Sequence, residues 1–207
     1  MDFGAYIFVV VISYMLGSTP SGYLVGMARG IDVRSAGSGN IGATNVVRVL
    51  GKKAGAIVLI SDAFKGFISA RWVPLLALQI FPAGGTRENL ALVGGAAAIL
   101  GHIYPCWLKF KGGKGIATTG GVVLAWVPAA CFITVGFWIL GLLISRYVSV
   151  ASIVAAVVLP FAVWFCDGSQ TMIIVITAVS LLAIYKHKAN IHRLLTGAER
   201  RIGKSQT

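Results

Sequence analysis

Six long apolar segments dominate this chain of 207 residues; they fall at residues 5–27, 54–81, 90–104, 116–144, 148–165 and 172–185. A helix needs about 20 apolar residues to cross the hydrocarbon core of a membrane. Only 12% of the residues are charged and the mean hydropathy is +0.85, whereas a soluble domain carries about 25% charged residues. The composition therefore predicts an all-α, polytopic membrane helix bundle, with residues 1–207 as one domain.

Positive charge is distributed unevenly between these segments. Lys and Arg crowd residues 29–53, 109–114 and 186–204, whereas the loops at 82–89 and 167–170 carry one cation between them. The positive-inside rule assigns the three basic stretches to the cytoplasm. From the second stretch to the third the chain must then cross the membrane an even number of times, although three apolar segments separate them.

Pro128 offers a way to satisfy this parity, because proline removes a helix donor and clashes with the preceding turn. Dividing segment 116–144 there gives seven passes, with the N-terminus outside and the C-terminus in the cytoplasm; six passes is the alternative. As a helix, residues 116–127 would extend only about 18 Å. This pair is therefore predicted to be a short or re-entrant hairpin, and residues 197–207 a frayed basic tail.

Three polar islands lie at the ends of apolar segments, and the first covers residues 37–48. Its glycines match the spacing of a dinucleotide-binding loop, but that loop must follow a strand, and this one follows an apolar helix. Glycine still lets backbone N–H groups approach an anion, and arginine binds phosphate through a planar fork. We predict a phosphate site with Ser38, Gly39, Asn40, Thr44, Asn45 and Arg48 as its residues here.

The second island, residues 101–115, carries a glycine pair between two lysines. A P-loop requires Ser or Thr after the lysine, and Gly115 follows Lys114, so the island does not match the P-loop of an NTPase. Two cations and unpaired backbone N–H groups would then surround one anion. The alternative is a flexible cytoplasmic turn whose lysines only set topology. The predicted ligands are Lys111, Gly112, Gly113, Lys114 and Gly115.

The third island covers residues 185–193. His187 and Asn190 are spaced by three and are expected to share one helical face. His187 is a candidate general base or phosphate donor, and an interfacial histidine is the alternative. Ser149, which opens the segment at 148–165, could donate to the same anion. His102 could face the site or merely end a helix, and His192 falls on another face.

Charged residues also interrupt the segment at 54–81. Charges inside a membrane span are costly and usually face the bundle interior. Asp62 and Lys65, three residues apart, are expected to pair, while Arg71 lies nearer the outer half. The net charge of +12 is explained by the basic loops rather than by nucleic acid. No carboxylate cluster suggests a metal, and no cofactor is predicted.

The islands resemble three motifs of the bacterial acyl-phosphate glycerol-3-phosphate acyltransferases. The matching stretches are GSGNIGATNVVR, GHIYP with FKGGKGIAT, and HKANIHRL, in the family's order. The resemblance implies a seven-helix bundle in the bacterial inner membrane with its active site facing the cytoplasm. It also implies transfer of an acyl group from acyl phosphate to the 1-hydroxyl of sn-glycerol 3-phosphate, giving lysophosphatidic acid and inorganic phosphate without an acyl-enzyme.

Motif positions then imply a polar site made of Ser38, Arg48, Lys114, His187 and Asn190. Either His187 or a substrate phosphate would take the hydroxyl proton. The expected partners are glycerol 3-phosphate, long-chain acyl phosphate and membrane lipids, with no nucleic acid and no obligate protein partner.

The third motif departs from the family pattern. The family reads Arg-His-Arg-Glu-Asn, whereas residues 186–190 read Lys-His-Lys-Ala-Asn. Ala189 removes any role for an acid at that position, and lysine lacks the bidentate reach of arginine. A transporter or flippase for a phosphorylated solute or lipid is the competing function, because broken helices and glycine motifs also fit that class. It predicts inverted repeats and gates on both faces.

Overall fold

The structure, a computed structural model, describes residues 3–202, and these residues form helices and loops without a strand. The all-α prediction is therefore confirmed. The chain divides into two compact units, unit 1 (Met1–Trp126) and unit 2 (Val127–Thr207). Unit 1 contains α1 (Phe3–Ser18), α2 (Ser21–Met27), α3 (Ala43–Leu50), α4 (Lys52–Ile80), α5 (Arg87–Ile103), the 3₁₀ turn η1 (Cys106–Leu108) and α6 (Ile116–Trp126). Unit 2 contains α7 (Pro128–Ser145), α8 (Val148–Phe165), α9 (Gln170–Lys186) and α10 (Lys188–Leu195).

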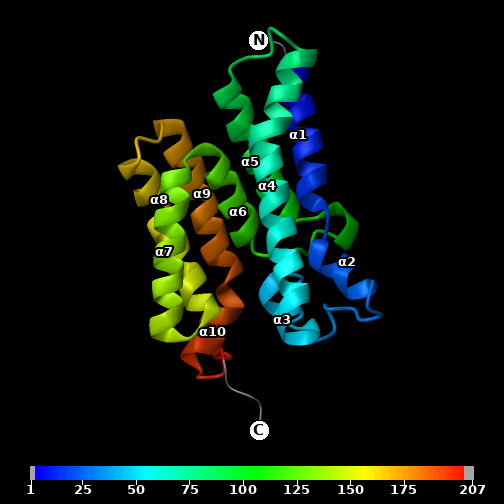
Figure 1. Ribbon diagram of the computed structural model, residues 1–207, viewed down its shortest axis with the longest axis vertical. Helices are drawn as coiled ribbons and strands as arrows, with labels where there is room; N and C mark the ends of the chain where they lie inside the picture. Colours follow the sequence, from blue (N-terminus) through cyan, green and yellow to red (C-terminus); the bar gives the residue numbers. More distant parts are fainter. Residues whose placement is uncertain (1–2, 203–207) are drawn as a thin grey trace. The chain divides into compact units, whose positions relative to one another are not determined.

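In unit 1, α1, α4 and α5 lie side by side, and α6 packs on α4 (Figure 1). Glycine allows these close approaches. A Cβ on Gly17 of α1 would collide with the backbone of Ala98 in α5, and one on Gly121 of α6 would collide with the backbone of Ala63 in α4. Small residues at crossings bring helix backbones together where the lipid provides no hydrophobic drive between helices.

Four stretches of the described residues are long and apolar enough to span a membrane, and the bent pair α9–α10 makes a fifth if it is one span. The α4 helix has 29 residues but carries charged side chains, and α6 has only 11 residues. The seven-pass count, its six-pass alternative and the orientation of the termini therefore stay predictions. The four stretches are Phe3–Met27, Arg87–Leu108, Pro128–Ser145 and Val148–Phe165.

The predicted break at Pro128 is confirmed, because α6 ends at Trp126 and α7 begins at Pro128. A second proline break was missed. Residues 5–27 were predicted as one segment, but Thr19 and Pro20 separate α1 from α2. Proline lacks the N–H that would continue the α1 ladder, so the same rule explains both breaks. The short helices α3 and η1 were not predicted either.

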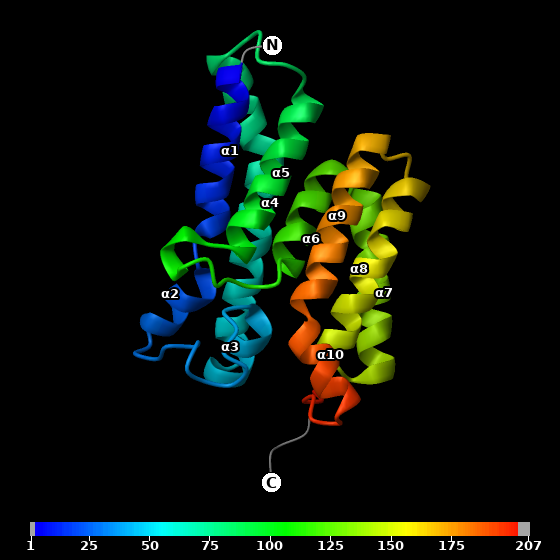
Figure 2. The ribbon, with the colours of Figure 1, turned by 180° about the vertical axis from the view of Figure 1, so that it is seen from behind.

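In unit 2, α7 packs on α8 and α8 on α9 (Figure 2). After α10 the chain reverses at Gly197, whose φ is 72°. The N–H of Gly197 donates to the carbonyl of Leu194 (3.2 Å), and that of Ala198 donates to the carbonyl of Arg193 (2.8 Å). This pattern is a Schellman motif, which favours glycine at the left-handed position.

The reversed segment docks on the corner between α7 and α8. The N–H of Ile202 donates to the carbonyl of Arg146 at 2.9 Å, and Arg201 donates to the Tyr147 hydroxyl at 2.9 Å. The prediction of a frayed tail is therefore wrong for residues 197–202, because the tail finds hydrogen-bond partners on its own unit. Residues 203–207 of that predicted tail lie outside the described range.

Candidate functional site

Asn45, at the start of α3, holds the first island in shape. Its side-chain oxygen accepts from the backbone N–H of Ser38 at 2.7 Å. Its amide nitrogen donates to the carbonyls of Val33 at 2.9 Å and Ala36 at 3.1 Å. Gly37 has a φ of 64°, and a Cβ there would collide with the Asn45 oxygen. Asn45 thus orders the loop, and its predicted contact with phosphate stays a prediction.

The remaining first-island groups are arranged around this loop. The side chains of Ser38 and Arg48 are exposed, and Thr44 is half-buried in the first turn of α3. Asn40 accepts from the N–H of Gly42 at 2.8 Å. The N–H of Gly39 donates to the Ala36 carbonyl at 3.1 Å, so this N–H group is used within the loop. The exposed side chains of Ser38 and Arg48 are therefore the groups of this island that an anion can reach most directly.

The second island folds back on the C-terminus of α5. The N–H of Gly112 donates to the carbonyl of Ile103 at 3.2 Å, and that of Gly113 donates to the carbonyl of His102 at 3.1 Å. The prediction that these glycines present unpaired N–H groups is wrong, because the last carbonyls of a helix need donors. Lys111 is exposed and Lys114 is half-buried; their role as ligands stays a prediction, as does that of Gly115.

A buried ionic cluster lies beneath this loop. Asp62, only 3% exposed, accepts from the Ser21 hydroxyl at 3.0 Å and pairs with the Lys65 ammonium at 2.9 Å. The predicted pairing of Asp62 with Lys65 is confirmed. The Lys65 ammonium also donates to the Thr19 carbonyl at 2.9 Å. The cluster therefore ties α4 to the break between α1 and α2.

His102 connects the cluster to the second island. Its Nδ1 lies 3.6 Å from Asp62 Oδ1, and its ring packs so closely on Gly113 that no Cβ would fit there. The imidazole is buried inside unit 1. The side chain packs against the loop that carries Lys114, and the two alternatives for His102 both stay predictions.

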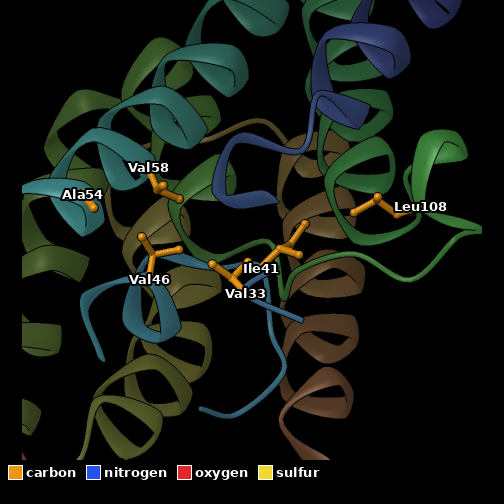
Figure 3. Packing of buried hydrophobic residues seen from close by; sticks show 6 residues of the cluster. All are labelled: Val33, Ile41, Val46, Ala54, Val58 and Leu108. Carbon is orange, nitrogen blue, oxygen red and sulfur yellow. The ribbon is translucent and has the colours of Figure 1, made fainter. Parts of the chain in front are cut away.

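The first and second islands contribute to one hydrophobic cluster in unit 1. Val33 and Ile41 come from the loop before α3, and Leu108 comes from η1 in the second island. Figure 3 shows Val33 and Ile41 next to each other, with Val46 turned toward α4. The full cluster is Val33, Ile41, Val46, Ala54, Val58 and Leu108. The two islands are thus neighbours in space.

The third island lies in unit 2, at a break between two helices. His187 ends α9 and precedes α10, and the two helices are bent by 50°. The helix is therefore bent at His187, which caps the start of α10, and the shared face of His187 and Asn190 stays a prediction. His187 is 2% exposed, and its Nδ1 lies 2.8 Å from the carbonyl of Ala183. A carbonyl only accepts, so Nδ1 carries the proton, and in the neutral ring Nε2 is the basic nitrogen.

Glu199, which the sequence did not single out, is the centre of a second buried network. Its Oε1 accepts from the Ser149 hydroxyl at 3.0 Å and from the Asn190 amide at 2.7 Å. Its Oε2 accepts from Arg193 Nε at 2.7 Å. Burial alone would raise the pKa of Glu199, but the hydrogen bonds from Asn190, Arg193 and Ser149 hold it below its ordinary value.

Two predicted site residues, Ser149 and Asn190, are thus brought together by a carboxylate. One signal for it was present in the sequence. Glu199 is the only acidic residue in the basic stretch at 186–204, and it follows a glycine by two positions. A lone carboxylate among cations after a helix-ending glycine is a candidate for a local ion pair.

These features define a class: a helical membrane protein whose cationic, glycine-rich loops end its apolar helices. The chain belongs to the glycerol-3-phosphate acyltransferase family, whose sequence model matches residues 7–197. A glycerol-3-phosphate acyltransferase of Desulfotalea psychrophila is 44% identical over 190 residues, which cover 92% of this chain and 94% of that protein. The one of Aquifex aeolicus is 40% identical over 195 residues, covering 94% and 98%.

Solved structures agree with this assignment. The crystal structure of PlsY (YgiH), an integral membrane glycerol 3-phosphate acyltransferase, in its glycerol 3-phosphate form superposes with a TM-score of 0.87 at 40% identity. It covers 97% of this chain and 96% of that one. The lysophosphatidic acid form gives a TM-score of 0.84 with the same coverage. The chain is therefore an integral membrane protein with bacterial relatives.

Proposed function

We propose that this protein transfers a fatty acyl group from acyl phosphate to the 1-hydroxyl of sn-glycerol 3-phosphate, in phospholipid synthesis at the bacterial inner membrane. The acceptor is supported by family membership and by the glycerol 3-phosphate form of the related PlsY. The product, lysophosphatidic acid, is supported by the second form of that protein. The proposals of an acyl-phosphate donor and of a cytoplasmic active site are supported by the motif resemblance and the basic loops.

The observation that carries the proposal is the packing of the first and second islands on one buried cluster. Both substrates carry a phosphate group, so the reaction needs at least two cationic groups near each other. Arg48 lies on α3, which contributes Val46 to the cluster, and Lys114 follows η1, which contributes Leu108. We assign Arg48 and Lys114 to the two phosphates, because charge-assisted hydrogen bonds to phosphate are the strong ones.

The chemistry requires one bond to form and one to break. The glycerol oxygen attacks the carbonyl carbon of the mixed anhydride, and the bond from that carbon to the phosphate oxygen breaks. The hydroxyl proton passes either to Nε2 of His187 or to a substrate phosphate, and inorganic phosphate leaves. His187 has the tautomer that a base needs, since its Nδ1 faces the Ala183 carbonyl. No covalent acyl-enzyme is involved.

The other predicted residues act by positioning and charge. In unit 1 these are the exposed Ser38 hydroxyl, the first-island residues Gly39, Asn40, Thr44 and Asn45, and the second-island residues Lys111, Gly112, Gly113 and Gly115. In unit 2 they are Ser149 and Asn190. We assign all of them to this reaction as a proposal.

Phosphate release from palmitoyl phosphate by the purified protein tests the reaction. Release should require glycerol 3-phosphate and should yield one lysophosphatidic acid per phosphate. A protein that releases no phosphate, yet carries labelled glycerol 3-phosphate into liposomes, would instead be the transporter considered above.

Lys114→Met tests the assignment of the second island. Loss of a hydrogen bond to a charged group costs about 1.5–3 kcal/mol, so kcat/KM should fall about 10- to 150-fold. Lys109→Met is the matched control, because Lys109 is an exposed cation of the same loop. Equal activity of the two variants would contradict the role of Lys114. A flat pH–rate profile through neutrality would argue against His187 as the base.

A further inference from the structure

The Glu199 network joins three parts of unit 2 that are far apart in sequence. Ser149 opens α8, Asn190 and Arg193 lie on α10, and Glu199 follows the reversal at Gly197. The N–H of Glu199 also donates to the carbonyl of Arg193 at 3.0 Å, so its backbone is fixed together with its side chain. Glu199 is 8% exposed, and Ser149 and Asn190 are buried as well. The Glu199 carboxylate is therefore fixed in position. It can in this way also fix the orientation of the side chains that donate to it.

The direction of these hydrogen bonds limits what the donors can do. A serine hydroxyl has one proton, and that of Ser149 is donated to Glu199. Ser149 can therefore act toward another group only as an acceptor while the network is intact, and the predicted donation from Ser149 to an anion would require this hydrogen bond to open. Asn190 donates one N–H to Glu199, which fixes the rotation of its amide and so the direction of its carbonyl oxygen and second proton.

Glu199 is poorly suited to act as a base. Three donors stabilise its charged form, and a carboxylate stabilised in this way binds a proton weakly. A buried charge is costly unless it is paired and hydrogen-bonded, and here both oxygens have donors. The geometry fits a group that orients others better than one that exchanges protons.

We propose that Glu199 is the positioning residue of the third island, fixing the amide of Asn190 and the side chain of Arg193 for the acyl-transfer reaction. The inference rests on the proposed function, because it assumes that Asn190 takes part in that reaction. Glu199 acts through Asn190 and Arg193 and does not itself contact the reacting atoms.

The test compares three variants in the palmitoyl phosphate assay, with kcat and the KM for glycerol 3-phosphate measured separately and normalised to folded protein. Glu199→Ala should lower kcat at least about tenfold, since small misplacements of reacting groups cost up to about a hundredfold. Glu199→Gln keeps an oxygen for Asn190 and Ser149 but turns an N–H toward Arg193, so it should restore part of kcat. The control is Glu88→Gln, an exposed acid at the start of α5.

The outcomes separate the two proposals. An inactive wild-type protein would refute the proposed function, whereas an active wild type with wild-type kcat and KM in Glu199→Ala would overturn only the positioning role. A lower yield of folded protein with unchanged kcat per folded molecule would also overturn it, since that is a structural role alone. If Glu199→Ala does not fold, Glu199→Gln decides: unchanged kcat and KM overturn the inference.

Discussion

Asp62 in unit 1 and Glu199 in unit 2 are both buried carboxylates that need polar partners. They find these partners at different separations along the sequence. Asp62 finds its main partner, Lys65, one turn along the same helix. Glu199 finds Ser149 50 residues away and reaches Asn190 only because the chain reverses after α10. A pair within one helix follows from helical periodicity, whereas a pair across a reversal depends on tertiary structure. The first was therefore predicted from sequence, and the second was not.

The two networks also differ in exposure. The side chains of Asp62 and Lys65 are 4% and 8% exposed, whereas that of Arg193 is 35% exposed. If Glu199 is removed, water can replace part of the hydrogen bonding that Arg193 loses. If Asp62 is removed, water cannot do the same for the buried Lys65 ammonium. We therefore expect the Asp62 pair to matter most for folding and the Glu199 network to matter most for function.

Asp62→Ala should give the largest effect on stability. It leaves the Lys65 ammonium buried without its carboxylate, and breaking a buried pair costs about 3–5 kcal/mol. Unfolding in detergent micelles, followed by circular dichroism, measures the loss. The double variant Asp62→Leu/Lys65→Met should recover most of it, because an apolar replacement of both partners is often neutral. If Asp62→Ala were as stable as the wild type, the Asp62 pair would not matter more for folding than the Glu199 network does.

Gly197→Ala should have a smaller effect, confined to unit 2. A left-handed conformation costs a residue with a Cβ about 1–2 kcal/mol, and this strain falls on the turn that positions Glu199. We expect a modest drop in unfolding midpoint together with a lower kcat. The matched control is Gly136→Ala on α7, where a Cβ meets nothing within 4 Å and should stabilise the helix. A normal kcat in Gly197→Ala would indicate that the reversal does not serve the reaction.

The smallest expected effect is a pH dependence of stability that Glu199 contributes. Because its folded pKa is lowered, its contribution is present above the unfolded pKa of about 4.3. That contribution is lost as the pH falls through the lower folded value. The stability difference between wild type and Glu199→Gln should therefore shrink below about pH 4. A difference that is the same at pH 7 and in acid would show that the charge of Glu199 does not stabilise unit 2.

Much of the helical framework could be predicted, because its signals can be read from short stretches of sequence. These signals are the length of each apolar segment, the helix break at Pro128 and the charge of each loop. The break at Pro20 follows the same proline rule but was hidden, since the segment at 5–27 already had the length of one membrane span. Short amphipathic helices such as α3 leave a weak signal among basic loops. The bend at His187 was missed because a spacing of three suggests a continuous helix.

The candidate site was predictable in residue type but not in hydrogen bonding. Glycine spacing indicated anion-binding loops, yet the N–H groups of Gly112 and Gly113 are used to end α5. Asn45 looked like a phosphate donor, but both protons of its amide go to loop carbonyls. Which partner a polar group takes depends on neighbours that the sequence does not place.

The Asn45 amide has a consequence for how tightly a small anion can be held. It has already fixed the backbone at Ser38, so the entropy of ordering this loop is lost during folding and not at each encounter with substrate. Ligand affinity improves when the receptor segment is rigid beforehand. Under the proposed function, a loop preorganised in this way would release one polyol phosphate and accept the next without rebuilding itself in every turnover.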